Sequence, residues 1–166
     1  MTKKGSWFWS LCGVVVVADV VTKRVAEQAL QPMHVPHEIV GDVVRFTLTY
    51  NPGAAFSMSL GEYSRWGFAI MAAVVLVVLI RSLKTTDHDD IWQAAALGLV
   101  SGGAIGNLVD RLRHAHGVVD FIDVGLGDWR FWTFNVADMG VTIGAIMLII
   151  AMLRSPARAS STEKVL

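Results

Sequence analysis

The chain has 166 residues, of which 54% are hydrophobic and 17% are charged, and its formal net charge is zero. Soluble domains usually carry about 25% charged and about 45–50% apolar residues. The composition therefore favours an integral membrane protein, as does the mean hydropathy of +0.52. The balanced charge argues against a nucleic-acid partner, and the single cysteine, Cys12, excludes an internal disulfide framework.

Four segments are long and apolar enough to cross a membrane, which takes about 20 residues. We predict transmembrane helices over about residues 6–25, 64–83, 91–110 and 132–153, within one integral membrane domain of residues 1–154. The third is the clearest, because Ile91–Val109 carries no charge. A cleaved signal peptide is the alternative for the first segment, but Asp19 and Lys23 stand where a small-residue cleavage site is expected.

The connection between the first two predicted spans is β-rich over residues 35–60. Val43–Tyr50 alternates in polarity and contains β-branched residues, which indicates a strand. Asn51-Pro52-Gly53 indicates a turn. We expect a small extracytoplasmic sheet on the membrane surface, where Phe56 either rests on the membrane or packs as an ordinary interface residue.

Residues 111–131 are expected to form a second extracytoplasmic loop, in which Trp129 and Trp132 suit the membrane interface. Residues 155–166 are polar and form a cytoplasmic tail. The fold class is therefore an all-α membrane protein with four transmembrane helices, a small extracytoplasmic β-sheet and a second extracytoplasmic loop.

The orientation in the membrane follows from the short loops. Each side of the predicted membrane domain carries seven Lys and Arg residues. On the side of the two termini these residues occupy much shorter segments, and short loops dominate the positive-inside rule. We therefore expect both termini in the cytoplasm and the two longer connections outside.

The ionisable residues within the predicted spans all fall near the outer surface. Charged groups inside a membrane are costly and need partners. Asp19 and Lys23 are four residues apart on one helix and can form an ion pair. Asp110 is expected to pair with Arg111. Both pairs can be read as purely structural.

Two asparagines lie at the same depth as these charges. Asn107 shares a helix face with Asp110, and Asn135 shares one with Asp138. Glycines repeat at four-residue spacing in the third and fourth spans, which lets membrane helices approach closely. We expect this approach to bring the faces of Asn107 and Asn135 together.

Asp138 differs from Asp19 and Asp110 because no basic residue lies within a helical turn of it, and Asp120 has apolar residues on both sides. Both have mainly apolar neighbours, and a desolvated aspartate tends to keep its proton. Two such aspartates in one neighbourhood indicate a pair that shares a proton, as catalytic carboxylates do. We expect Asp120 and Asp138 to be functional.

Five short motifs follow one another on the outer side of the predicted spans. They are Asp19-Val20-Val21-Thr22-Lys23, Asn51-Pro52-Gly53-Ala54-Ala55-Phe56-Ser57, Gly106-Asn107-Leu108-Val109-Asp110-Arg111, Val118-Val119-Asp120-Phe121 and Phe134-Asn135-Val136-Ala137-Asp138. Each is weak alone, but together and in this order they make the chain, from about Trp7 to Leu153, resemble bacterial lipoprotein signal peptidase (signal peptidase II).

The resemblance implies a membrane aspartic endopeptidase of the bacterial inner membrane, with its active site near the outer surface. Its substrates would be diacylglyceryl-modified prolipoproteins, which it would cut just before the lipidated cysteine. The resemblance implies contact with membrane lipid, a cyclic-peptide inhibitor that binds at the catalytic pair, and no cofactor or metal. We expect a monomer.

Carried over by motif, the catalytic residues are Asp120 and Asp138. The residues that match substrate-binding or site-supporting positions of the family are Asn51, Gly53, Asn107, Asp110, Arg111, Asn135, Asp19 and Lys23. The family usually has Gln after the first aspartate, where this chain has Val20. The departure concerns only what that Gln contacts.

Three other functions compete with this interpretation. A proton-coupled transporter or channel subunit would use intramembrane acids, but its polar path should run through the full depth of the membrane. A metalloprotease would need more than His114 and His116, since the sequence has no His-Glu-x-x-His motif. A Ser/Lys protease would combine Lys23 with Ser57 or Ser101, and nothing in the sequence sets either serine apart.

Overall fold

The computed structural model describes residues 2–53 and 64–154. Phe56, Ser57 and the tail 155–166 lie outside the described residues, so the predictions made for them are not tested. The four helices are α1 (Lys3–Ala29), α2 (Ser64–Thr85), α3 (Ile91–Arg113) and α4 (Val136–Arg154). The strands are β1 (His37–Val40), β2 (Val44–Asn51), β3 (Val118–Leu126) and β4 (Trp129–Arg130).

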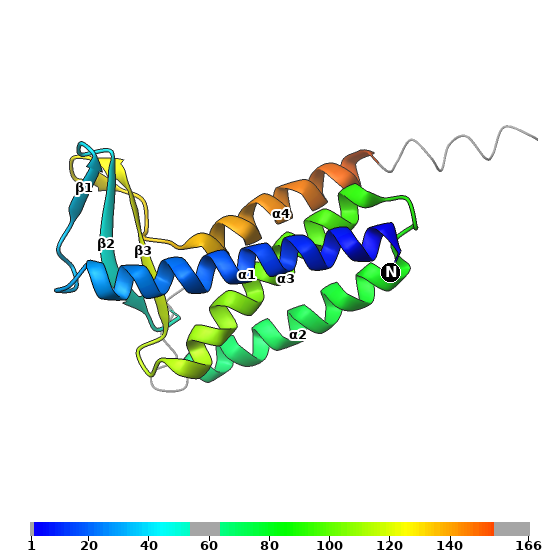
Figure 1. The fold of residues 1–166 in the computed structure, drawn as a ribbon, viewed down its shortest axis with the longest axis horizontal. Coiled ribbons are helices and arrows are strands. Elements are labelled where there is room, and N and C mark those ends of the chain that lie inside the picture. The colour runs from blue at the N-terminus through cyan, green and yellow to red at the C-terminus, as the bar shows by residue number, and fades with distance from the viewer. Residues whose placement is uncertain (1, 54–63, 155–166) are drawn as a thin grey trace, which may run out of the picture.

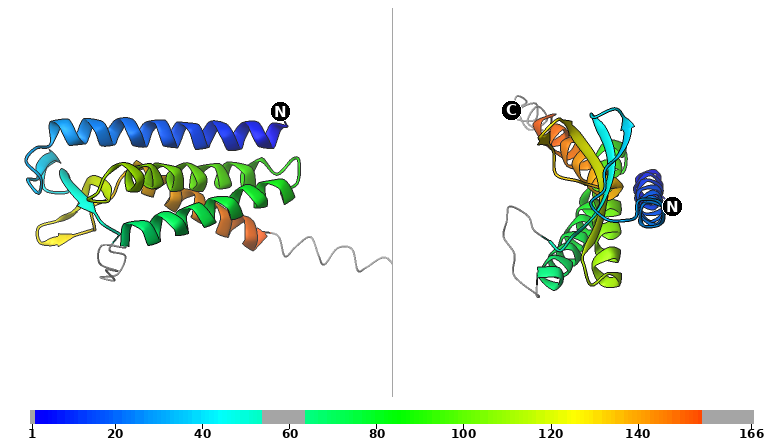
Figure 2. Two further views of the ribbon diagram at one scale, coloured as in Figure 1. Left: turned by 90° about the horizontal axis from the view of Figure 1, so that it is seen from below. Right: turned by 90° about the vertical axis from the view of Figure 1, so that its left-hand side faces the viewer.

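The helices run side by side, and the sheet lies at one end of them (Figure 1). The N-terminus, the turn between α2 and α3, and the end of α4 all lie at the opposite end. The two further views in Figure 2 show the same separation. Successive helices therefore run in opposite directions, as expected for four segments joined by connections at alternate ends.

Three of the four helices, α1, α2 and α4, are long and apolar enough to cross a membrane. Within the part of the chain that the structure describes, α3 does not meet the same criteria, although Ile91–Val109 looked like the clearest span. Its glycines and Asn107 lower its hydropathy. This helix lies against α1, α2 and α4, and small residues suit a helix that packs mainly on other helices. A fourth crossing stays a prediction.

The spaced glycines of α3 and α4 let the helices approach closely, as expected. A Cβ on Gly98 would lie 2.6 Å from the carbonyl oxygen of Phe8, and one on Gly102 would lie 2.8 Å from that of Cys12. On α4, a Cβ on Gly144 would lie 2.6 Å from the side chain of Val100. Side chains at these positions would force α3 away from α1 and α4, so the glycines set how closely the three helices approach.

The four strands form one antiparallel sheet in the order β1-β2-β3-β4. The predicted strand of Val43–Tyr50 is confirmed as β2, one residue later. The predicted second loop over 111–131 contains β3 and β4, two strands that the sequence analysis did not predict. Thr49 of β2 lies opposite Asp120 of β3, so Asp120 stands on a strand.

The sheet is fixed to the end of α1 by an apolar cluster. Its members are Ala26, Leu30, Leu48, Val119 and Phe121. Because side chains alternate along a strand, Phe121 faces this cluster while its neighbour Asp120 faces the other side. The cluster therefore aims Asp120 at the ends of α3 and α4.

The start of α4 is set by a reciprocal pair of hydrogen bonds. The side-chain oxygen of Asn135 accepts from the backbone N–H of Asp138 at 3.0 Å, and the Asp138 carboxylate accepts from the N–H of Asn135 at 3.2 Å. This is the capping-box arrangement. The fourth helix consequently begins at Val136, four residues later than the predicted span.

Candidate active site

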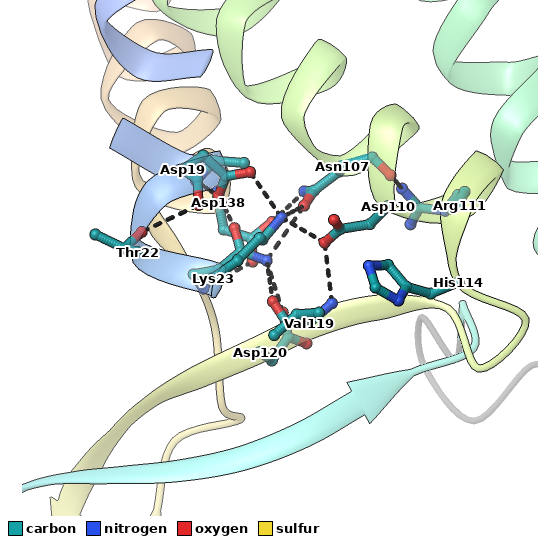
Figure 3. Close-up of polar contacts among 12 residues, drawn as sticks. Asp19, Thr22, Lys23, Asn107, Asp110, Arg111, His114, Val119, Asp120 and Asp138 are labelled. Carbon is teal, nitrogen blue, oxygen red and sulfur yellow. Dashed lines mark hydrogen bonds and ion pairs between the residues drawn. The ribbon is translucent and has the colours of Figure 1, made fainter. Parts of the chain in front are cut away.

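A cluster of polar side chains lies where the helices meet the sheet (Figure 3). It draws residues from α1, α3, β3 and the start of α4. The predicted site residues that the structure brings together here are Asp19, Lys23, Asn107, Asp110, Arg111, Asp120, Asn135 and Asp138. The expectation that the faces of Asn107 and Asn135 meet is confirmed, because Asn135 Nδ2 donates to Asn107 Oδ1 at 3.2 Å.

Lys23 lies at the centre of the buried part of the cluster. Its ammonium lies 2.8 Å from Asp19 Oδ2 and 2.9 Å from Asp110 Oδ2, and it donates to Asn107 Oδ1 at 2.9 Å. The predicted Asp19–Lys23 pair is confirmed. The predicted pair of Asp110 with Arg111 is wrong, because Asp110 pairs with Lys23 across two helices.

The two carboxylates around Lys23 also bind backbone groups. Asp19 Oδ1 accepts from the N–H of Ala137 at 2.9 Å, at the start of α4. Asp110 Oδ2 accepts from the N–H of Val119 at 3.1 Å, on β3. Both contacts fix segments that carry another aspartate.

Asn135 joins the two aspartates that the sequence singled out. Its side chain is fully buried, and its Nδ2 donates to Asp120 Oδ1 at 2.6 Å. Its backbone N–H binds Asp138 in the capping box. Asp120 and Asp138 therefore meet at one residue, although one lies on β3 and the other on α4.

Asn107 holds Asp138 from the other side. Its Nδ2 donates to Asp138 Oδ1 at 2.8 Å, while its Oδ1 faces Lys23. An ammonium can only donate, so Lys23 fixes which end of the Asn107 amide faces Asp138. The Asp138 carboxylate thus receives two N–H donors from described residues.

The environment of Asp120 favours its protonated form. Burial and the negative charge of Asp138 raise the pKa of Asp120 from 3.8 to about 7. Hydrogen bonds from Asn135 and Asn51 and the positive charge of Lys23 oppose the rise. The negative charge of Asp138 therefore acts directly on Asp120.

Arg111 lies beside this pair and not in an ion pair with Asp110. Its guanidinium donates to the carbonyl oxygen of Asn107 at 3.1 Å and lies 5.6 Å from the ring centre of Phe68. Its Nε is buried and has no hydrogen-bond partner among the described residues. Arg111 consequently keeps a donor that the described part of the protein does not use.

The turn after β2 comes close to the same region. Asn51 Oδ1 accepts from the N–H of Gly53 at 2.9 Å, and Gly53 has a φ of 105°. A Cβ on Gly53 would overlap the ring of Phe68, the residue beneath Arg111. Glycine is required here by both its conformation and its packing, which confirms the predicted turn.

An apolar groove of about 360 Å³ opens beside Asp138. It is lined by Phe131, Phe134, Asp138, Met139, Thr142 and Ile143. Sequence reasoning did not select these apolar residues. The helical spacing of Thr142 from Asp138, at i,i+4, was the signal that could have identified one wall.

The two histidines His114 and His116 lie beside Tyr50. The rings of His114 and His116 lie 6.0 and 5.8 Å from the ring of Tyr50. His114 Nδ1 is 3.7 Å from a carboxylate oxygen of Glu27. Among the described residues, no group of three or more His, Cys, Asp or Glu side chains is arranged to hold a metal ion.

The comparison with protein families matches residues 11–154 to signal peptidase II. A lipoprotein signal peptidase of Pseudomonas syringae pv. tomato is 44% identical over 153 residues, which covers 90% of this chain and 87% of that protein. One from Coxiella burnetii is 41% identical over 163 residues, which covers 94% of this chain and 97% of that protein.

Two solved structures, both described as bacterial membrane enzymes, share the fold. One has a TM-score of 0.79 and 29% identity, and covers 98% of this chain and 93% of its own. The other has a TM-score of 0.79 and 30% identity, and the match covers 91% of this chain and 94% of the other chain. Fold and sequence therefore agree over nearly the whole chain.

Proposed function

The chain belongs to the signal peptidase II family and removes signal peptides from prolipoproteins, and we propose that it does so as an aspartic endopeptidase with Asp120 and Asp138 as the catalytic pair. The observation that carries the proposal is the position of Asn135, which binds both carboxylates. Two acids from separate segments have been brought to one point, at a cost in charge burial that a structural role does not explain.

We place the shared proton of the resting enzyme on Asp120. Asp120 is 3% exposed, and burial together with the charge of Asp138 raises its pKa to about 7. Asp138 is more exposed than Asp120 and accepts two N–H donors, from Asn107 and from the backbone of Asn135. We therefore take Asp120 as the acid and Asp138 as the base.

Hydrolysis then follows from these two protonation states. Asp138 takes a proton from a water molecule while the water oxygen attacks the scissile carbonyl carbon. At the same time Asp120 gives its proton to the carbonyl oxygen. When the C–N bond breaks, Asp138 passes its proton to the leaving amine and Asp120 recovers its own from the collapsing diol. The pair returns to its starting state.

Arg111 is placed to hold the substrate, and Asn51 and Gly53 support the site. The buried Nε of Arg111 has no partner among the described residues, and a guanidinium can bind a peptide or ester carbonyl. Asn51 contacts Asp120 from the end of β2, and Gly53 allows that turn to pack on Phe68. We assign substrate binding to Arg111 and support of the site to Asn51 and Gly53.

The groove beside Asp138 suits a lipidated substrate. Apart from Asp138 and Thr142 its lining is hydrophobic, and it continues onto the exposed side of α4 at Met139 and Ile143. An acyl chain or an apolar signal-peptide residue could enter from the lipid without crossing water. We infer that the enzyme takes diacylglyceryl-modified precursors and cuts before the modified cysteine.

The test uses the purified protein with a prolipoprotein precursor in two forms, with and without diacylglycerol on its cysteine. We expect cleavage of the lipidated form before that cysteine, unchanged by a metal chelator. Equal cleavage of both forms would contradict the lipid requirement, and loss of activity with chelator would contradict the aspartic mechanism.

The relatives named above are peptidases, which gives the transporter hypothesis no support. It can be tested separately by reconstituting the protein in liposomes under a proton gradient. Flux that Asp138→Asn abolishes, without any proteolysis of the lipidated precursor, would refute the peptidase mechanism.

A further inference from the structure

The three partners of the Lys23 ammonium come from two different helices. Asp19 lies on α1 itself, and Asp110 and Asn107 lie on α3, all within 2.8–2.9 Å of Nζ. An ammonium has three donors, and Lys23 is only 2% exposed. Its whole donor capacity is therefore used inside the protein.

Each of the two carboxylates binds the backbone at an equivalent place. Asp19 accepts from the N–H of Ala137, the residue directly before Asp138. Asp110 accepts from the N–H of Val119, the residue directly before Asp120. One cation thus joins two carboxylates, and each carboxylate binds the backbone N–H of the residue that precedes one member of the catalytic pair (Figure 3).

We propose that Lys23 is a positioning residue that sets the spacing of Asp120 and Asp138 by holding Asp19 and Asp110 together. Its third bond serves the same end, because Asn107 Oδ1 faces Lys23 and Asn107 Nδ2 consequently faces Asp138. The inference rests on the proposed function, since it takes Asp120 and Asp138 as the reacting groups.

The arrangement has a chemical reason. Backbone hydrogen bonds join Phe121 and Ile122 of β3 to Phe134, just before α4, and the side chains of the cluster set the rest of the geometry. For catalysis that geometry must be held to within about 0.5 Å. A compact ammonium can meet three acceptors that converge from different directions, whereas the planar guanidinium of Arg cannot match them equally well. Lysine is therefore the side chain suited to this position.

A role in folding alone makes a different prediction from positioning. If Lys23 only neutralised buried acids, its loss would reduce the amount of folded protein, and the remaining folded enzyme would behave normally. If Lys23 positions the pair, folded enzyme without it has a lower kcat and nearly the same KM. A displacement of about 1 Å can cost about 100-fold in rate.

The pH profile gives a second readout. The charged groups that face Asp120 are Asp138 from α4, Lys23 from α1 and Arg111 from α3. The Lys23 charge lowers the pKa of Asp120, so removing it raises that pKa further. Because the mechanism needs protonated Asp120, the loss of activity at high pH should move to higher pH.

The experiment compares Lys23→Met and Lys23→Arg with Arg24→Met, the matched control on the next, exposed residue of α1. Activity on the lipidated precursor is measured per folded enzyme. In Lys23→Met we expect kcat to fall about 100-fold and the loss of activity at high pH to move to higher pH. In Lys23→Arg we expect kcat to fall about tenfold or more, with the loss of activity at the same pH as in wild type. Arg24→Met should match wild type.

Lys23→Arg keeps the buried charge and decides the question if Lys23→Met gives no folded protein. Wild-type kcat in the folded Lys23 variants would overturn the positioning role. The proposed function would survive that result if Asp120→Asn and Asp138→Asn were still inactive, and it would fail if they were active.

Discussion

Asp120 and Asp138 are chemically the same group in two different environments. Asp120 is buried on a strand, while Asp138 is partly exposed at the start of a helix, where it belongs to a capping box. The capping box supplies one hydrogen-bond donor to Asp138, and Asn107 supplies a second. Neutral N–H groups therefore bind Asp138 directly, while Lys23 and Arg111 supply the positive charge that faces the pair.

The buried position of Asp120 has a measurable cost in stability. Its pKa rises from 3.8 to about 7 on folding, so between about pH 4 and pH 7 the folded state binds more protons than the unfolded state. Stability then falls as the pH rises through this window and stays lower above it. At about 1.4 kcal/mol per pKa unit, the loss is about 4 kcal/mol at most.

Asp120→Asn cannot ionise and should escape this loss. We expect the variant to be inactive but to unfold at a higher temperature than wild type at pH 8, with little difference at pH 4. Thermal unfolding of the detergent-purified protein at the two pH values measures this. Asp128→Asn, in the exposed turn between β3 and β4, is the control, and equal melting temperatures at pH 8 would argue against a raised pKa.

Contacts within one helix were predictable from the sequence, and contacts between elements were not. The Asp19–Lys23 pair follows from i,i+4 spacing and is found. Asp110 was assigned to its neighbour Arg111, but its partner lies 87 residues earlier, at Lys23. Asp138 looked unpaired because its partners are neutral N–H groups, which a search for opposite charges does not detect.

At the level of helices and strands, hydropathy located the helices, but the second outer connection was misjudged. Val118–Val124 is rich in β-branched and aromatic residues around Asp120 and Asp123, and this composition could have indicated a strand. The aspartates and the flanking glycines favoured a loop instead. The strand forms because β2 offers its edge and the apolar cluster under the sheet buries Val119 and Phe121.

The glycines of α3 give a test at this scale. A Cβ on Gly106 would lie 2.5 Å from Asp19 Oδ2 and 3.2 Å from the Cβ of Ala137. Gly106→Ala should therefore displace Asp19 and the start of α4, and we expect activity on the lipidated precursor to fall about tenfold or more.

Gly13→Ala is the matched control, because its Cβ would meet no atom within 4 Å. Alanine favours a helix over glycine by up to about 1 kcal/mol, so this variant should keep its activity and melt at the same or a higher temperature. Equal activity of the two alanine variants would mean that α3 does not need the close approach at Gly106.

In the whole molecule, the proposed active site and the sheet lie at one end of the helices and the N-terminus lies at the other (Figure 1). We propose that residues 1–154 form a single membrane domain crossed four times, with both termini in the cytoplasm. The catalytic pair would then lie near the outer surface, where a precursor held in the membrane by its lipid presents its cleavage site.

The orientation can be tested with single cysteines in a Cys12→Ala background. Asp128→Cys lies in the β3–β4 turn and Asp87→Cys lies in the α2–α3 turn. A membrane-impermeant maleimide added to intact spheroplasts should label Asp128→Cys at once and Asp87→Cys only after permeabilisation. Labelling in the opposite order would reverse the proposed orientation.

The central claim is that Asp120 and Asp138 act together on the peptide bond. The most direct measurement is kcat on a diacylglyceryl-modified prolipoprotein for Asp120→Asn and Asp138→Asn separately, with Asp128→Asn as the control. Each catalytic variant should lose about 10³-fold or more, while folding normally and while the control stays at the wild-type rate. More than about a tenth of wild-type activity in either variant would contradict a catalytic pair.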